Sequence, residues 1–249
     1  MFIMEYVKQR RSIRKYQERD IDQNLLNELL ETASRASTMG NLQLYSVVVT
    51  RDAEIKKALA PAHFNQPMVF DAPVLLTFCA DFHRTSVWCE NRKAVPGYDN
   101  FLSFLNASID TLLFAQTFCT LAEEKGLGLC YLGTTIYNPD LIIDTLKLPK
   151  LVMPVTTVTL GYPAENPPQA DRLPVEAFVH EEAYHDYTAM DIDRLYAYKE
   201  ALPENKHFVE INKKETLAQI FTDIRYTKKD NEFMSETYLA SMKKQGFLK

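Results

Sequence analysis

The spacing of apolar residues along the chain predicts alternating helices and strands. Apolar side chains recur at intervals of three and four over 21–36, the repeat that places them on one face of a helix. Asp20 or Asp22 is the expected N-cap of that helix, and Gly40 is the expected terminator. Continuous runs of β-branched and apolar residues predict buried strands. Strands are therefore expected at 45–50, 74–80, 129–133 and 152–160, and further helices at 2–10, at 53–60 and in the segment that follows Asn138-Pro139.

The order of these elements predicts the fold class. Helices and strands alternate, but without the regularity of a doubly wound βαβ fold. We expect an α+β fold with a central sheet, helices on both of its sides and a helical C-terminal extension over 190–249. Four prolines within 163–175 disfavour both helix and strand. This segment is the expected seam within what we predict to be a single domain, 1–249.

One segment, 101–122, is apolar on nearly every side and contains a single charge, Asp110. Its 22 residues would be long enough to cross a bilayer. A charged residue near the centre would cost roughly 2.5–3.5 kcal/mol there, and no basic flank sets an orientation. We therefore expect a helix buried in the protein core or at a subunit interface, not a membrane span.

Composition and charge exclude several classes of partner. The chain has 249 residues and a formal net charge of −5, so it offers no basic face to a nucleic acid or an anionic membrane. The four cysteines lack metal-type spacing and are expected to be free thiols. The histidines show no HxxH or HExxH pattern, so no metal site is predicted. The first residues include Glu5 and lack the apolar run of a signal peptide, which predicts a cytoplasmic protein.

Two polar clusters are candidates for binding a phosphorylated ligand. The chain contains neither G-x-G-x-x-G nor G-x-x-x-x-G-K-[ST], so side chains would have to supply the contacts. The first cluster is Arg10-Arg11-Ser12-Ile13-Arg14, whose three guanidiniums suit bidentate phosphate contacts. The second is 37–43, a loop with two amides between a predicted helix and a predicted strand. Each could also be an ordinary feature, a solvated basic run or a polar connection.

In this order and separation, the two clusters resemble the opening of the FMN-dependent nitroreductase superfamily. There an R-R-S-x-R-like run is followed by a helix and a loop of the S-x-x-N-x-Q type. The later segments at 126–133 (GLGLCYLG) and 165–174 (ENPPQADRLP) are similar to motifs of its larger, NADPH-preferring branch of oxygen-insensitive nitroreductases and flavin oxidoreductases. The segments at 178–184 and 238–247 also resemble that branch, so the resemblance covers nearly the whole chain.

The resemblance implies a nitroreductase-like fold with a central mixed β-sheet, and a homodimer with FMN bound non-covalently at the subunit interface. It implies that Arg10 and Arg172 hold the FMN phosphate, with Arg11 and Ser12 nearby. Arg14 would face the pyrimidine edge of the flavin ring, where a cation stabilises the reduced form. Contacts from the partner subunit or at the ring edge would come from Ser37, Thr38, Asn41 and Gln43; Gln66 would bond the ring; and the backbone of Tyr131, Leu132, Gly133 and Thr134 would lie by flavin N5.

Two positions depart from the pattern of that branch. Its members often have two glycines beside flavin N5, whereas this chain has Gly133-Thr134. The backbone N–H is kept, but the side chain of Thr134 is expected to change the local clearance. The branch also uses an arginine shortly before its last helix to bind the nicotinamide phosphate. Here Lys228 or Lys229 would have to bind that phosphate as a point charge.

The function that the resemblance implies is an FMN-dependent NAD(P)H oxidoreductase. NADPH or NADH would give hydride to flavin N5, and a nitroaromatic, a quinone or free flavin would then accept the electrons in a ping-pong cycle. This chemistry needs orientation and electrostatics, and no catalytic side chain is predicted. One alternative is another FMN reductase of the same fold, such as a dehalogenase or an enone reductase. Others are a non-enzymatic FMN-binding module and an α+β dimer without flavin, which would be colourless.

Overall fold

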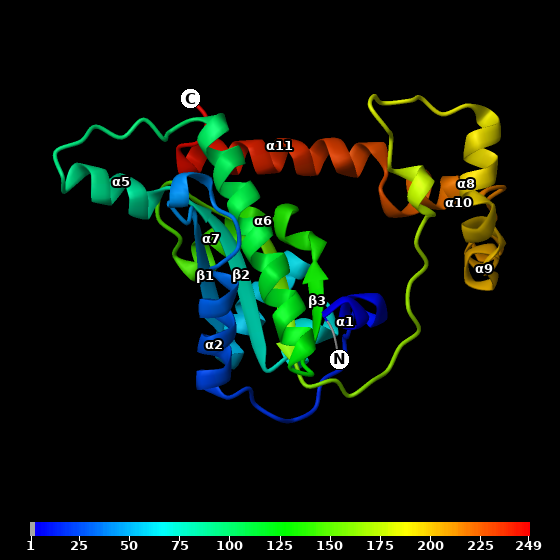
Figure 1. The fold of residues 1–249 in the computed structure, drawn as a ribbon, viewed down its shortest axis with the longest axis horizontal. Coiled ribbons are helices and arrows are strands. Elements are labelled where there is room, and N and C mark those ends of the chain that lie inside the picture. The colour runs from blue at the N-terminus through cyan, green and yellow to red at the C-terminus, as the bar shows by residue number, and fades with distance from the viewer. Residues whose placement is uncertain (1–2) are drawn as a thin grey trace. The chain divides into compact units, whose positions relative to one another are not determined.

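The computed structural model describes residues 3–249, and these form two compact units (Figure 1). Unit 1 extends to Pro168 and also includes Met234–Lys249, whereas unit 2 is Gln169–Phe233. The division lies inside 163–175, the proline-rich segment that was expected to form a seam.

The centre of unit 1 is a four-stranded sheet in the order β1-β2-β4-β3. The strands are β1 (Tyr45–Thr50), β2 (Val74–Asp81), β3 (Gly128–Leu132) and β4 (Val152–Gly161), close to the predicted positions. The α+β class is confirmed, but every strand pair among the described residues is antiparallel, which corrects the expected mixed sheet. The physical reason is the strand order. β2 and β3 run in the same direction, but β4 lies between them, so these two strands share no hydrogen bonds.

Helices pack on both faces of this sheet, as predicted. One face carries α2 (Gln23–Ala33) and α6 (Phe101–Glu124), and the other carries α3 (Ala53–Leu59), α4 (Pro67–Asp71) and α7 (Pro139–Leu146). β2 shows why its sequence is continuously apolar. Leu76 and Phe78 pack in the core beside α2 and α6, while Leu75 packs in the core on the opposite face. Successive side chains of a strand point to opposite faces, so a strand covered on both sides must be apolar throughout.

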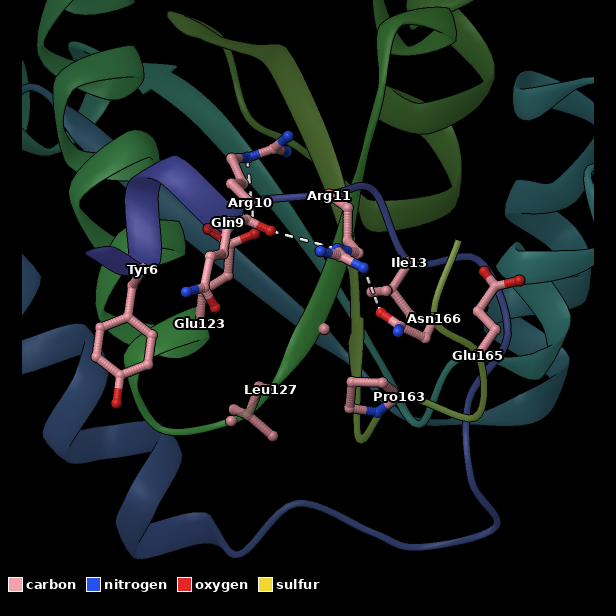
Figure 2. A pocket seen from close by; sticks show the side chains of 12 residues that line it. Tyr6, Gln9, Arg10, Arg11, Ile13, Glu123, Leu127, Pro163, Glu165 and Asn166 are labelled. Atoms are coloured by element: carbon pink, nitrogen blue, oxygen red, sulfur yellow. Dashed lines mark hydrogen bonds and ion pairs between the residues drawn. The ribbon is translucent and has the colours of Figure 1, made fainter. Parts of the chain in front are cut away.

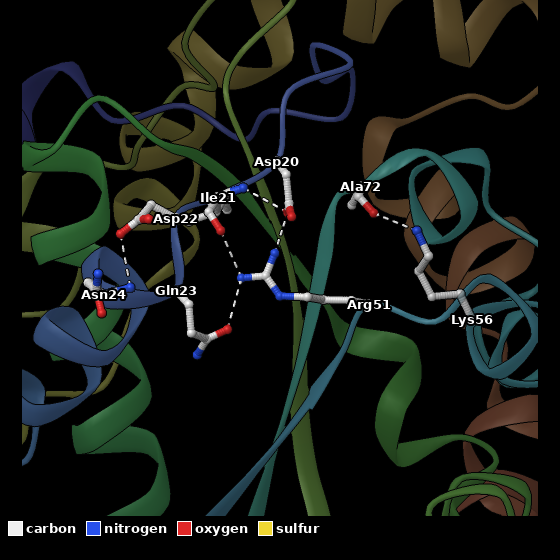
Figure 3. Close-up of polar contacts among 8 residues, drawn as sticks. All are labelled: Asp20, Ile21, Asp22, Gln23, Asn24, Arg51, Lys56 and Ala72. Atoms are coloured by element: carbon white, nitrogen blue, oxygen red, sulfur yellow. Dashed lines mark hydrogen bonds and ion pairs between the residues drawn. The ribbon is translucent and has the colours of Figure 1, made fainter.

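The start of α2 is fixed by carboxylates and by an arginine from β1 (Figure 3). Asp22 is the N-cap, since its side chain accepts hydrogen bonds from the backbone N–H groups of Asn24 at 2.9 Å and Leu25 at 3.0 Å. Arg51, directly after β1, forms an ion pair with Asp20 and donates to the Ile21 carbonyl at 2.9 Å. The two candidates for the cap therefore have different roles, one at the helix end and one in tying the helix to the sheet.

The end of α2 corrects the prediction that Gly40 terminates this helix. The helix ends at Ala33, and the Ser34 backbone N–H donates to Leu30 and Glu31. Gly40 instead lies in the short turn η1 (Met39–Asn41) with a φ of 56°. Its left-handed conformation belongs to the loop that leads into β1, where glycine adopts it without a steric penalty.

The apolar helix α6 is buried on one side only. Phe114, Phe118 and Ala122 pack against the sheet within the core. Six large apolar side chains of this helix are exposed, with fractions of 52% for Phe101, 63% for Leu102, 43% for Leu105, 44% for Ile109, 48% for Leu112 and 44% for Leu113. Among the described helices, none is long and apolar enough to cross a membrane.

Unit 2 is helical, as predicted for the C-terminal extension. Its elements are η4 (Val175–Ala177), α8 (Ala189–Ala201), α9 (Pro203–Ile211), α10 (Leu217–Ile220), η5 (Phe221–Arg225) and the start of α11 (Lys228–Gln245). The end of α11 belongs to unit 1, where Met242 and Phe247 pack with Phe104 of α6. The remaining elements of unit 1 are α1 (Ile3–Gln9), η2 (Ala60–His63), α5 (His83–Glu90) and η3 (Gly133–Ile136). The predicted start of the first helix at residue 2 lies outside the described residues.

Candidate functional site

The segment 10–14, called the arginine run below, is bound to β3. The Ile13 backbone N–H donates to the Leu129 carbonyl at 2.9 Å, and the Ile13 side chain packs over Gly128. A Cβ on Gly128 would come within 2.7 Å of Ile13 Cγ1, so only glycine allows this close approach. The contact positions Arg10 and Arg11 at the edge of a surface pocket.

This pocket has a volume of about 230 Å³ and is formed entirely by unit 1. Figure 2 shows Arg10 and Arg11 among the residues that line it, with Glu123 of α6 next to Arg10 and Asn166 next to Arg11. Pockets that enclose a whole drug-sized ligand measure about 300–1,000 Å³. The volume therefore suits the phosphate-bearing end of a ligand better than a complete flavin. The other lining residues include Tyr6, Gln9, Ile13, Gly126, Leu127, Gly128, Pro163 and Glu165.

Charges in the pocket are partly compensated. Arg10 Nε lies 3.6 Å from Glu123 Oε1, and both side chains are largely buried. Burial raises the pKa of Glu123 to about 7, while the Arg10 guanidinium opposes that rise. Arg11 donates to Asn166, to the Pro167 carbonyl at 3.2 Å and to the Gln9 carbonyl at 3.3 Å. A guanidinium has five N–H donors, so these contacts leave capacity for an anion.

Residues 165–167, at the start of the ENPPQADRLP segment, contact the arginine run. Glu165 Oε1 accepts from the backbone N–H of Arg14 at 2.6 Å and from that of Lys15 at 3.1 Å. Arg14 is exposed and Ser12 is half-buried. Two motifs that are far apart in the sequence are thus brought together, and Glu165 and Asn166 fix the conformation of the arginine run.

A second region brings Gln66 close to the Gly133-Thr134 turn. Gln66 Nε2 donates to the His63 carbonyl at 3.1 Å, and His63 Nδ1 lies 2.9 Å from Thr134 Oγ1. The rings of Phe64 and Tyr137 are 6.2 Å apart. We call His63, Gln66 and Thr134 the His63–Thr134 region. Burial lowers the pKa of His63 to about 4, so this imidazole is neutral at pH 7.

The turn at Gly133-Thr134 borders open space, and the loop at Phe64-Asn65 has a strained backbone. A Cβ on Gly133 would meet nothing within 4 Å, and Gly133 is exposed, so the turn borders open space. Tyr131 is half-buried and Leu132 is buried in β3 directly before it. Phe64 and Asn65 both have a φ of 53°. Left-handed conformations cost on the order of 1–3 kcal/mol each in non-glycine residues, and they concentrate at functional sites.

The loop at 37–43 is anchored to the middle of α6. Asp110 accepts from Thr38 Oγ1 at 2.5 Å and from the backbone N–H of Met39 at 2.9 Å. Gln43 Nε2 donates to Asn41 Oδ1 at 2.7 Å, and Ser37 is exposed. Glu123 lies thirteen residues beyond Asp110 on the same helix, which is about 20 Å at the helical rise per residue. Within one chain, this loop is therefore not brought to the arginine pocket.

The remaining predicted residues lie in unit 2. Arg172 is exposed and donates to the carbonyls of Ala170 at 3.3 Å and Asp171 at 2.8 Å. Lys228 lies 3.7 Å from Glu232, and Lys229 is exposed. Their roles toward a phosphate stay predictions.

Sequence reasoning assigned no role to four residues that shape unit 1 at these sites. Glu165 and Asn166 lie inside the ENPPQADRLP segment, and that resemblance was the signal that could have found them. No local pattern marks Glu123 or His63, because each acquires its role from a residue distant in the sequence. Asp110 was noticed only as an obstacle to membrane insertion, although its position opposite a polar loop is what makes a charge tolerable there.

Comparison with known proteins gives consistent results. The model of the Nitroreductase family matches residues 7–162. The chain is 32% identical over 196 residues to the FMN reductase (NAD(P)H) of Bacillus subtilis, with 78% of each protein covered. It is also 32% identical over 194 residues to the oxygen-insensitive NADPH nitroreductase of Salmonella typhimurium, again with 78% of each covered.

A solved structure extends the likeness to almost the entire chain. The crystal structure of a Bacteroides fragilis protein, provisionally described as an oxidoreductase, is 70% identical and superposes with a TM-score of 0.98, covering 99% of this chain and 100% of that one. The family match covers more than half of the chain, and both regions of the candidate site lie within or directly beside it. The chain belongs to the nitroreductase family.

Proposed function

We propose that the protein is an FMN-dependent NAD(P)H oxidoreductase that reduces nitroaromatics, quinones or free flavin. The observation that carries this proposal is the convergence of Arg10 and Arg11 on one pocket next to β3. Relatives named as an FMN reductase and an NADPH nitroreductase support the same conclusion. NADPH or NADH is the proposed electron donor.

The residues present fit the phosphate end of FMN. Arg10 and Arg11 both line the pocket, so two positive charges lie at one site. Arg10 and Arg11 would bind the phosphate, with Ser12 beside them, and Arg172 of unit 2 is proposed as a third donor. Bound FMN supplies the two-electron chemistry, and the protein supplies binding, orientation and electrostatics.

The ring end would be held by the His63–Thr134 region. We propose that Gln66 and the backbone of 131–134 orient the flavin ring, with Arg14 providing positive charge at its edge. The open space beside Gly133 leaves room for a planar group. The neutral state of His63 means that this region adds no titrating charge near pH 7.

We propose further that the functional form is a homodimer with FMN at its interface. Six large apolar side chains of α6 are 43–63% exposed along one face, which is the composition of a buried subunit interface. Ser37, Thr38, Asn41 and Gln43 lie far along α6 from the arginine pocket of their own chain. Their proposed flavin contacts would therefore be made to the site that includes the arginines of the partner.

The dimer is tested by placing a charge on this face. Ile109→Lys is expected to convert the dimer to monomer in analytical ultracentrifugation and to weaken FMN binding, because burying an unpaired ammonium is costly. Ala58→Lys, at an exposed position of α3 on the opposite face of the sheet, is the control. A wild-type protein that sediments as a monomer would contradict the proposal.

Three finer assignments complete the proposal. The chain acts as a single domain, 1–249, in which the helical segment 190–249 is an extension.

Lys228 or Lys229 binds the phosphate of NADPH, so replacing both by alanine is expected to raise KM for NADPH more than KM for NADH. The protein is cytoplasmic.

The central experiment is anaerobic visible spectroscopy of the purified protein. We expect flavin absorption bands that bleach on addition of NADPH, and repeating the titration with NADH gives the donor preference. Flavin that stays oxidised would favour an FMN-binding module. Reduction without turnover of nitroaromatics or quinones would favour a dehalogenase or an enone reductase. A colourless protein that takes up no added FMN would overturn the cofactor assignment.

A further inference from the structure

His63 is a buried imidazole with a partner on one side only. Its exposed fraction is 0%, and Nδ1 lies 2.9 Å from Thr134 Oγ1. Nε2 is buried and has no hydrogen-bond partner among the described residues. A buried polar atom without a partner is uncommon in a folded protein and requires an explanation.

The orphaned nitrogen indicates which tautomer is present. The imidazole is neutral and carries one proton, on Nδ1 or on Nε2. A proton on Nε2 would leave a buried N–H donor with no acceptor, an arrangement that native structures avoid more strictly than an unpaired acceptor. The proton is therefore on Nδ1, and His63 donates to Thr134 Oγ1.

This assignment determines what the Thr134 hydroxyl can do. Its oxygen accepts from His63, so its own proton is directed to another acceptor. Within residues 3–249, no hydrogen bond of the structure uses that proton. Thr134 is half-buried and follows Gly133, whose neighbourhood is open space. A second glycine at this position would present no hydroxyl at all.

We propose that the Thr134 hydroxyl donates a hydrogen bond to the bound flavin ring, and that His63 is the positioning residue that holds it as a donor. The proposal rests on the proposed function, because it requires FMN in this site. Reduction places negative charge on the ring, and a donor aimed at developing charge stabilises the charged form. Thr134 would thus raise the reduction potential of bound FMN and make it a readier acceptor of hydride from NAD(P)H.

The reduction potential of bound FMN tests the donor. Thr134→Val keeps the shape but removes the hydroxyl, and Thr134→Ser keeps the hydroxyl. We expect Thr134→Val to bind reduced FMN about tenfold more weakly relative to oxidised FMN, a lowering of about 30 mV for a two-electron couple. Thr134→Ser is expected to match the wild type. An unchanged potential in Thr134→Val would overturn the proposal.

Variants of His63 test the positioning. His63→Leu frees the hydroxyl to rotate, so the potential is expected to fall, but by less than in Thr134→Val. The double variant His63→Leu/Thr134→Val is expected to have the potential of Thr134→Val, because the hydroxyl is then already absent. Additive shifts would mean that His63 acts independently of Thr134, which contradicts the positioning role.

The tautomer is tested without activity or cofactor. Nitrogen-15 NMR of histidine-labelled protein is expected to show His63 protonated on Nδ1 and neutral from pH 6 to pH 8. A proton on Nε2 would overturn the proposal even if every Thr134 variant failed to bind FMN. A wild-type protein that binds and reduces FMN, with Thr134→Val unchanged, would contradict this inference alone. A wild-type protein without FMN would contradict the proposed function.

Discussion

The Arg10–Glu123 pair and the His63–Thr134 region form the two ends of the proposed FMN site, and each contains one titratable group with a strongly shifted pKa. Burial raises the pKa of Glu123 to about 7 and lowers the pKa of His63 to about 4. In both cases the low-dielectric surroundings favour the neutral form. Glu123 has a cation 3.6 Å away that opposes the shift, whereas His63 has only a hydroxyl.

Burial is the cause of both shifts, but it makes the free energy of unfolding depend on pH in opposite directions at the two residues. The contribution of His63 to the free energy of unfolding is present above pH 6.5 and is lost as the pH falls through about 4. The contribution of Glu123 is present below pH 4.5 and is lost as the pH rises through about 7. The phosphate end thus changes charge near neutrality, while the ring end keeps one charge state.

The largest expected effect is the acid destabilisation caused by His63. Its shift from 6.5 to about 4 corresponds to at most about 3 kcal/mol of unfolding free energy, lost between those two pH values. Urea denaturation of the FMN-free protein at several pH values should show this fall, and His63→Leu should flatten it. His207→Leu, an exposed histidine, serves as control. Equal slopes in wild type and His63→Leu would mean that His63 is not buried in its neutral form.

The next largest expected effect is the loss of FMN affinity when Arg10 is removed. A hydrogen bond to a charged group contributes about 1.5–3 kcal/mol, so Arg10→Ala should raise the Kd of FMN roughly 30-fold. Titration of the apoprotein by flavin fluorescence measures this change. Lys15→Ala removes one positive charge from the same segment and is expected to change the Kd little. A similar loss in both variants would indicate a general effect of charge and no direct contact.

The alkaline side of the comparison is tested by Glu123→Gln. The rise in pKa to about 7 would correspond to about 3 kcal/mol for a fully buried group. Partial solvent access reduces the expected change to roughly 1.5 kcal/mol. The wild type should lose this stability between pH 5 and pH 8, and Glu123→Gln should not. The same urea series measures it, and parallel curves for the two proteins would show that Glu123 ionises normally.

The elements that the sequence predicted are those whose pattern is local. The strand at 45–50 and the helix around Leu26 and Leu29 follow from side-chain type and spacing. The two leucines are buried as expected. β1, however, is an edge strand in which only Tyr45 and Thr50 are buried, which corrects the expected buried strand. The short helices α4 and α5 were not predicted. Neither has a side-chain N-cap, whereas the equally short α3 begins after the capping side chain of Asp52. The antiparallel pairing depends on β4 inserting beside β2, which no local pattern encodes.

The candidate site divides in the same way. Arg10 and Arg11 were found because residue type alone points to phosphate, and the structure places both at one pocket. The shifted groups were not found, because a pKa depends on burial and on partners supplied by the fold. Thr134 shows the intermediate case. The sequence marked it as a departure from a family pattern, but its hydrogen bond to His63, 71 residues away, required the tertiary structure.

The smallest expected effect concerns competition for Arg10. Above pH 7 the Glu123 carboxylate is ionised and shares this guanidinium with the FMN phosphate, whereas at pH 5 it is protonated and resembles glutamine. Repulsion between like charges at a partly exposed site is on the order of 1 kcal/mol or less, so Glu123→Gln should bind FMN about threefold more tightly than wild type at pH 8. The two proteins should bind equally at pH 5. Because the phosphate titrates identically in both, the ratio of their Kd values isolates Glu123. A ratio that does not change with pH would mean that the charge of Glu123 does not affect phosphate binding. The two regions would then not differ in how their charge affects FMN binding.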